Sequence, residues 1–267
     1  MKFTFDHDLH IHSILSSCAQ DTTQVKENIL AYARKNNLRQ ICLTDHFWDA
    51  SVPGASAWYE PQNYDWISQV QPLPQGEDTA FLFGCETELD KHMTLGVHPD
   101  HYDRFDFIVI PTTHFHMRFA APTEVVATTE GKIKLWLDRL EAVLNMDLPF
   151  HKVGIAHLVC PLLAVTRQNR EEYLRVLDNL PAEEMERLFS KAAQLGVGIE
   201  INKEDFMFAD NEADTVLRPF KVAKACGCKF YCGSDSHSQR SFDNMPQIMD
   251  RAIDLLNLQE SDKFHLQ

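Results

Sequence analysis

Histidine and carboxylate side chains recur in this chain where short apolar runs end. The series begins with Asp8-Leu9-His10-Ile11-His12 and continues with Thr44-Asp45-His46. Its later members, in chain order, are Glu86, His114, His157, Glu200, Asp235 and His237. Imidazole and carboxylate are the side chains that hold zinc, manganese or iron. The pattern predicts one metal site assembled from distant segments, and hence a metal-dependent hydrolase.

The two histidines of the first motif are separated by one residue. On an extended strand such residues point to the same side, so His10 and His12 can bind one cation. Asp8 precedes them and can orient an imidazole from behind the ligands. Taken alone, a later motif such as Asp45-His46 fits a hydrogen-bonded polar residue at a strand end better than a metal ligand. The repetition of such motifs favours a shared metal site.

The elements that position these residues are strands and helices in alternation. Apolar and β-branched runs predict seven strands, at 2–9, 40–44, 80–85, 105–111, 153–156, 198–201 and 229–232. Helical spacing and capping residues predict helices at 25–35, 132–144, 181–195, 213–226 and 246–258. This order is typical of a parallel sheet, and at this length it favours one α/β barrel of the TIM type over residues 1–267. Chemistry in such barrels gathers at the carboxyl ends of the strands.

The segment 51–77 follows His46 and is rich in Pro, Gln, Trp and Tyr. We interpret it as a long excursion above a strand end. It is either a lid or substrate loop, or a plain connection.

Composition limits the class of protein. The chain has 267 residues, is 44% hydrophobic and carries a formal charge of −14. That charge argues against a protein that grips nucleic-acid phosphates, and we expect no nucleic-acid or membrane partner. Seven cysteines do not form an obvious disulfide framework, and no apolar run is long enough to span a membrane. We therefore expect reduced thiols and a cytoplasmic location.

The order of the motifs resembles that of the PHP (polymerase and histidinol phosphatase) family across nearly the whole chain. The match runs from Asp8-Leu9-His10-Ile11-His12-Ser13 to Gly233-Ser234-Asp235-Ser236-His237, and the length is similar to that of stand-alone histidinol-phosphate phosphatases. The resemblance implies a distorted seven-stranded (β/α) barrel with two or three divalent zinc, manganese or iron ions. It also implies the ligands. A first metal would lie among His10, His12, Glu86 and Asp235, a second at His46 and His237, and a third at His114 and His157 with Glu86 bridging.

The chain departs from the family pattern after the first motif. Many members place a histidine or aspartate there, whereas this chain reads Ser13-Ile14-Leu15-Ser16-Ser17-Cys18-Ala19-Gln20-Asp21. Cys18 is the candidate replacement, because thiolate binds zinc and iron well. The alternative is a loop cysteine without a metal.

Three further residues are candidates for binding a phosphorylated substrate. Arg118 and Lys203 are the cations nearest in sequence to the metal-bearing strand ends, and His116 lies two residues beyond His114. The alternatives are surface salt bridges for the two cations and a surface histidine. Glu200 and Asn202 are expected to line the cavity without a metal role.

These features predict hydrolysis of a small phosphate monoester, with L-histidinol phosphate the first substrate to test. Clustered cations would lower the pKa of a bridging water, so that hydroxide attacks without a protein nucleophile. We expect Asp235 and His237 to serve catalysis. The alternatives are a phosphodiesterase or 3′-exonuclease, and a metal-binding regulatory module that has lost catalysis.

Overall fold

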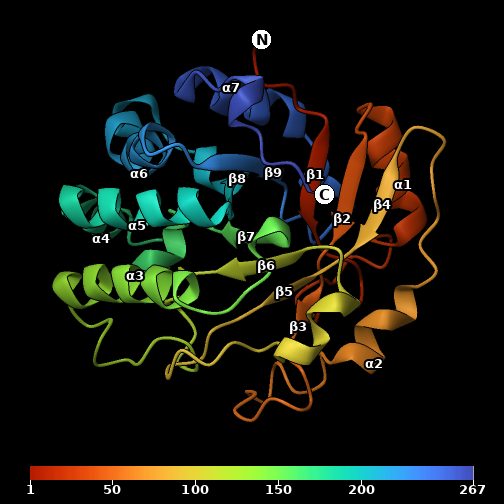
Figure 1. The fold of residues 1–267 in the computed structure, drawn as a ribbon, viewed down its shortest axis with the longest axis horizontal. Helices are drawn as coiled ribbons and strands as arrows, with labels where there is room; N and C mark the ends of the chain where they lie inside the picture. Colours follow the sequence, from red (N-terminus) through yellow and green to blue (C-terminus); the bar gives the residue numbers. More distant parts are fainter. Residues whose placement is uncertain (267) are drawn as a thin grey trace.

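The computed structural model describes residues 1–266 and has parallel strands at its centre with helices around them (Figure 1). The strands are β1 (His7–Ile11), β2 (Gln40–Leu43), β3 (His46–Phe47), β4 (Ala80–Phe83), β5 (Cys85–Thr87), β6 (Ile108–Pro111), β7 (Val153–Ala156), β8 (Gly198–Asn202) and β9 (Lys229–Gly233). The helices are α1 (Lys26–Lys35), α2 (Tyr64–Ile67), α3 (Thr129–Leu144), α4 (Arg170–Asp178), α5 (Ala182–Leu195), α6 (Ala213–Ala225) and α7 (Met245–Leu256). No helix among these is both long and apolar enough to cross a membrane.

The described strands form two sheets, and every ladder is parallel. One sheet has the order β1-β2-β4, and the other has the order β3-β5-β6-β7-β8-β9. The predicted parallel α/β fold is therefore confirmed. The closed barrel is not confirmed, because the ladders break between Leu43 and His46 and again at Gly84. A Cβ at Gly84 would lie 2.4 Å from the carbonyl oxygen of Phe107, so only glycine fits at this position.

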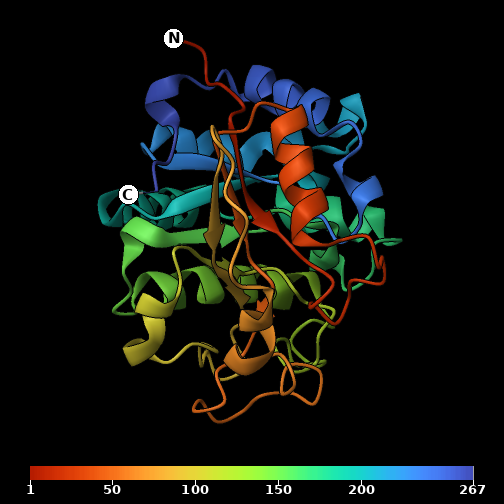
Figure 2. The same cartoon turned by 90° about the vertical axis from the view of Figure 1, so that its right-hand side faces the viewer.

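The first strand lies beside the segment that follows the last. The amide of Asp235 donates to the carbonyl of His10 at 2.8 Å, and the amide of His12 donates to the carbonyl of Ser236 at 3.0 Å. Figure 2 shows β1 close to the C-terminal strands. These bonds bring the carboxyl ends of β1 and β9 to the same place.

Four helices cover one side of the strands, with α7 above them and α1 on the opposite side (Figure 1). Their ends follow from local chemistry. Thr128 caps α3 by accepting from the amide of Gly131, and α5 stops at Gly196, whose φ of +77° is costly for other residues. All five predicted helices are confirmed within a few residues. The nine-residue helix α4 was missed because its sequence is mostly polar.

The predicted strand at 2–9 begins too early. The structure places the strand at His7–Ile11, and Lys2 instead forms a bridge with Gln259. The alternation of Lys2-Phe3-Thr4-Phe5 resembles a half-buried strand. It arises because Phe3 packs into the core, with its amide bonded to the carbonyl of Leu258 at 3.1 Å.

Candidate metal centre

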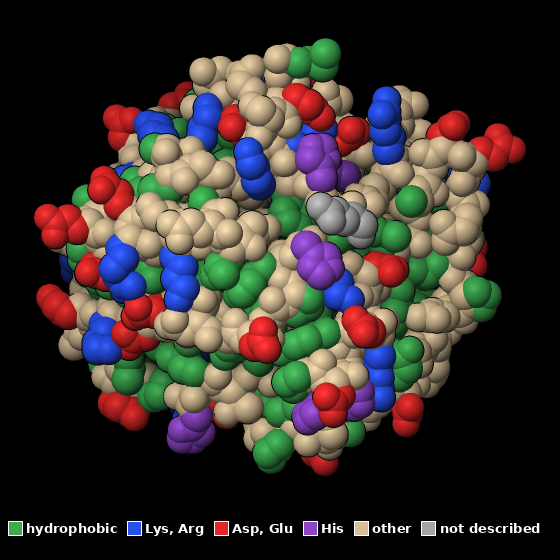
Figure 3. Space-filling view, in the orientation of Figure 1, with side chains coloured by type: hydrophobic (Ala, Val, Ile, Leu, Met, Phe, Trp, Pro, Cys, Tyr) green, Lys and Arg blue, Asp and Glu red, His purple; other side chains and the backbone are tan. Residues whose placement is uncertain are grey.

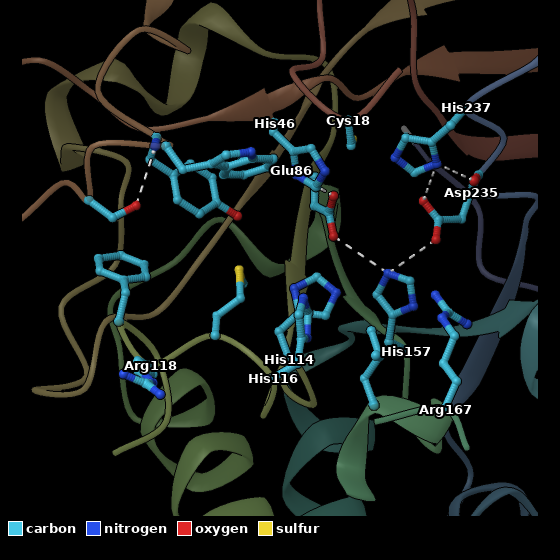
Figure 4. A pocket seen from close by; sticks show the side chains of 16 residues that line it. Cys18, His46, Glu86, His114, His116, Arg118, His157, Arg167, Asp235 and His237 are labelled. Atoms are coloured by element: carbon cyan, nitrogen blue, oxygen red, sulfur yellow. Dashed lines mark hydrogen bonds and ion pairs between the residues drawn. The ribbon is translucent and has the colours of Figure 1, made fainter. Parts of the chain in front are cut away.

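The predicted metal-binding residues meet at the carboxyl ends of the strands. They come from β1 and the residue after it, from β3 and β5, and from the turns after β6, β7 and β9. Those that reach the cavity surface are labelled in Figure 4, whereas His10 and His12 are fully buried beneath it. The cavity has a volume of about 630 Å³. Sequence segments from residue 10 to residue 237 are thus joined in one pocket.

Glu86 is the centre of this arrangement and is fully buried. Its Oε2 lies 2.8 Å from Nδ1 of His46 and 3.3 Å from Nε2 of His12, and its Oε1 lies 3.5 Å from Nε2 of His157. Neither carboxylate oxygen has a hydrogen bond of good geometry. A buried carboxylate without donors is costly. Burial raises the pKa of Glu86. The charges of the neighbouring His46 and His10 have a larger, opposite effect, so this pKa lies well below its usual value.

The spacing of the ligand atoms fits a shared cation. Nε2 of His12 lies 3.2 Å from Nε2 of His10 and 3.1 Å from Oδ1 of Asp235. Ligand atoms about 2.0–2.1 Å from a tetrahedral zinc ion lie roughly 3.3 Å from one another. Two nitrogens that face each other in this way cannot both donate. The nitrogen and oxygen atoms of these side chains therefore fit the coordination of a divalent cation.

Groups of three ligand atoms in close reach recur across the pocket. Within residues 1–266 they are His10, His12 and Glu86; His12, His46 and His237; Glu86, His114 and His157; and His10, His157 and Glu200. The first three match the three predicted metal positions. Asp235 contacts the first and third groups, through His12 at 3.1 Å and His157 at 3.6 Å.

Two of the predicted ligands have an unusual backbone conformation. His157 follows β7 with a φ of +55°, and Asp235 follows β9 with a φ of +50°. Residues other than glycine seldom adopt this left-handed region, and it concentrates at functional sites. The reversal ends each strand and leaves the side chain facing the pocket (Figure 4).

Buried carboxylates fix the imidazole tautomers from behind. Oε1 of Glu200 accepts from Nδ1 of His10 at 2.7 Å, and Oε2 of Glu200 accepts from the amide of His157 at 2.9 Å. Because Nδ1 of His10 keeps its proton in this bond, Nε2 is the nitrogen whose lone pair can bind a cation. A Cβ on Gly233 would lie 2.0 Å from Glu200, so glycine is required there. Glu200, predicted only to line the cavity, is thus an orienting residue.

A second relay supports His12. The hydroxyl of Ser16 donates to Oδ1 of Asp45 at 2.7 Å. Because its proton is used there, Oγ of Ser16 accepts from Nδ1 of His12 at 2.9 Å. Asp45 also accepts from the amide of Ser13 at 2.7 Å, which ties the loop after β1 to the end of β2. Asp45 supports a ligand, while His46 beside it faces the pocket.

A third relay supports His114. Its Nδ1 lies 2.9 Å from Oε2 of Glu88, and Glu88 is paired with Arg139. Both charged residues are fully buried, and Arg139 also donates to the carbonyls of Thr112 and Ala120. Neither Glu88 nor Arg139 was predicted. A buried arginine from the middle of α3 carries no sequence signal that separates it from a surface helix residue.

The predicted role of Asp8 is corrected. Asp8 does not hold an imidazole. Its oxygens accept from the amide of Ser234 at 2.9 Å and from the hydroxyl of Tyr32 at 3.0 Å. It joins β1 to the end of β9, and Glu200 orients His10 instead.

The substrate candidates fall in different places. His116 and Arg118 line the cavity, as does Arg167, which was not predicted. Lys203 does not line it, because its ammonium group donates to the backbone carbonyls of Ser241 and Asp243. Cys18 lines the cavity next to His46 in Figure 4, but its sulfur is in none of the ligand groups.

The excursion 51–77 forms one wall of the cavity. Trp58 and Tyr59 line it, and the ring of Trp58 lies edge-on to His46 with a centroid distance of 4.9 Å. In Figures 1 and 2 the start of the excursion, in orange, extends below the strands. It is more than a connection, because it supplies aromatic surface beside the ligands.

Comparisons with known proteins agree with this architecture. No protein-family model matches the chain. The chain is 24% identical over 254 residues to a probable phosphatase of Shewanella oneidensis, covering 92% of this chain and 83% of that protein. It is 23% identical over 233 residues to a probable phosphatase of Caldicellulosiruptor saccharolyticus, covering 86% and 79%.

A solved structure is also similar. It is histidinol phosphate phosphatase from Lactococcus lactis, in complex with zinc, L-histidinol and phosphate. The TM-score is 0.54 at 17% identity, covering 93% of this chain and 94% of that one. What the two chains share is the fold.

Proposed function

We propose that this protein is a metal-dependent phosphatase that hydrolyses small phosphate monoesters in the cavity above Glu86. The observation that supports this most strongly is the environment of Glu86. Its buried carboxylate oxygens have no hydrogen bond of good geometry, and imidazole nitrogens of His12, His46 and His157 lie around them. The names of the two curated relatives and the ligands of the Lactococcus lactis enzyme support the same reaction class.

We assign two or three divalent zinc, manganese or iron ions to this site, because imidazole-rich ligand sets favour these metals over magnesium. The ligands would be His10, His12, Glu86 and Asp235 for the first ion; His46 and His237, with His12, for the second; and His114, His157 and Glu86 for the third. Such ions lower the pKa of water and neutralise charge on phosphoryl oxygens.

The protein groups around the reacting centre are poised as ligands. Burial and the neighbouring His12 lower the pKa of His237 to about 3, and its Nδ1 donates to the carbonyl of Asp235 at 2.8 Å. Burial raises the pKa of the Asp235 carboxyl, but His237 and His157 hold it well below its usual value. Neither side chain therefore holds a transferable proton at neutral pH. Their part in catalysis is to bind and orient.

Arg167 is the candidate for the phosphoryl group. It lines the cavity and lies on the same side as His157 in Figure 4. Arginine can bind two phosphoryl oxygens at once. The face of the molecule in Figure 3 carries acidic and basic side chains interspersed, unlike the continuous basic surface that a nucleic-acid partner would favour.

The test is turnover of a phosphate panel with the metal content measured on the same sample. The panel contains L-histidinol phosphate, p-nitrophenyl phosphate and the diester bis(p-nitrophenyl) phosphate. We expect monoester hydrolysis that a chelator abolishes and zinc, manganese or iron restores. Glu86→Gln keeps the shape but removes the charge, and is expected to lower kcat/KM more than about 100-fold. Metal-loaded protein that cleaves no monoester, or only the diester, contradicts the proposal.

A further inference from the structure

The cavity has two distinct parts. One is the set of histidines and carboxylates already described. The other is lined by the large side chains of Trp58, Tyr59, Met117, Phe119 and Leu162. Aromatic and apolar walls of this kind bind the flat, apolar body of an organic molecule.

The charges in the second part have one sign. The carboxylates that line the cavity are Glu86 and Asp235, and both face histidines. The remaining charged side chains of the lining are Arg118 and Arg167. No other carboxylate among the lining residues could bind an ammonium group. The charge of this part of the cavity is therefore positive, although the chain as a whole has a net charge of −14.

The two arginines differ in their surroundings. Arg167 is paired with Glu204, which offsets part of its charge. Arg118 differs, because none of the ion pairs within residues 1–266 includes its guanidinium group. In Figure 4 Arg118 lies across the cavity from Asp235 and His237, and its neighbours in sequence, Met117 and Phe119, also line the cavity. Its charge is available to a ligand at the end of the cavity away from the metal ligands.

We propose that Arg118 selects phosphate monoesters whose alcohol part carries a flat apolar body and an anionic group. This inference rests on the proposed phosphatase function. The phosphoryl group would lie at the metal ligands, the apolar body along Trp58 and Phe119, and the anion at Arg118. A carboxylate suits the planar guanidinium, whereas an ammonium group would meet a like charge. The pocket therefore disfavours amino alcohols such as L-histidinol.

Three aryl phosphates of matched shape test this selectivity. They are the O-phosphates of 3-(4-hydroxyphenyl)propanoate, 4-ethylphenol and tyramine, which carry an anionic, a neutral and a cationic tail. We expect kcat/KM to fall in that order, with roughly a tenfold difference between the first and the last. The difference should shrink at high ionic strength, since Arg118 is exposed.

Variants at Arg118 separate its charge from its size. Arg118→Gln is expected to remove most of the preference, and Arg118→Glu to reverse it. The matched control is Arg39→Glu, which makes the same charge change just before β2, at the other end of the strands. This control should keep the wild-type order. Circular dichroism and metal content confirm that each variant is folded and loaded.

The outcomes are distinguishable. Hydrolysis of all three esters at equal rates, or preference for the tyramine ester, overturns the inference and leaves the phosphatase function intact. An unchanged order in Arg118→Glu also overturns it. No hydrolysis of any ester by metal-loaded protein overturns the phosphatase function and the inference together.

Discussion

Nδ1 of His10 lies 2.7 Å from Oε1 of Glu200, and both side chains are fully buried. Because the carboxylate accepts at Nδ1, Nε2 is the atom that would give up its proton and offer a lone pair to a cation, and it faces Glu86 and Asp235. The orientation of His10, a proposed ligand on β1, is thus set by a residue on β8.

Replacement Glu200→Gln tests this relationship. The amide group must present hydrogens either to Nδ1 of His10 or to the amide of His157, where an acceptor is needed. We expect metal affinity to fall about 10–100-fold, as for other residues that orient ligands. Competition with a chromophoric chelator measures this. Glu183→Gln, at an exposed position in the first turn of α5, is the control, and equal affinity in both variants would argue against the relay.

The pair of Arg139 and Glu88 predicts a stability effect. Arg139→Met leaves a buried carboxylate without its partner, and is expected to cost about 3–5 kcal/mol in the free energy of unfolding. Adding Glu88→Gln to Arg139→Met removes the unpaired charge, so the double variant should be more stable than the single one. Denaturant unfolding of the metal-free proteins compares them. A double variant less stable than Arg139→Met would contradict this account.

The pKa of His10 predicts that metal binding depends on pH. Burial lowers this pKa, but the charges of Glu200, Asp235 and Glu86 outweigh it and raise the pKa from 6.5 to about 10 in the metal-free protein. The ring therefore carries an extra proton at pH 7, which a cation must displace. Apparent affinity should rise as the pH rises towards 10, by about tenfold per pH unit for each proton released.

Calorimetry in buffers of different ionisation enthalpy measures these protons. We expect roughly one or more per chain at pH 7, and fewer in His10→Asn. A binding heat that is the same in every buffer would show that His10 is already neutral before the metal arrives.

Cys18 is the site at which this chain departs from the pattern of the PHP family, and its role as a ligand remains our proposal. It lies in the cavity beside His46. Burial lowers the pKa of His46, but the charge of Glu86, and after it the nearby sulfur of Cys18, outweigh burial and raise that pKa. If Sγ binds the second ion, Cys18→Ser should lower the metal content by up to about one ion per chain. Cys226→Ser, at the end of α6, is the control. Equal metal content in the two variants would leave His12, His46 and His237 to bind that ion alone.

Much of the site could be predicted because its residues are marked by strand ends. A histidine after an apolar run is visible in the sequence, and the parallel arrangement then implies that such ends meet. The positions of His114 and His157 followed from this rule alone. The three metal groupings also agree with those that the resemblance implied.

The supporting residues could not be predicted in the same way. Glu88 follows Glu86 by two residues, just after β5, and only the fold shows that it faces His114 and Arg139. Lys203 illustrates the opposite error. It follows a strand end and is cationic, but its reach ends at the carbonyls of Ser241 and Asp243, which no pattern in the sequence announces.

The pairing of β1 with the segment after β9 has a consequence for the order of synthesis. A ribosome releases His10 and His12 first and Asp235 and His237 last, and domains fold as their segments emerge. The cavity floor therefore stays open until β9 has been made, since Asp235 takes its place by bonding to the carbonyl of His10. A nascent chain shorter than this holds only part of the ligand set. The proposed ligand set is thus complete only in chains in which β9 and the residues after it have been translated.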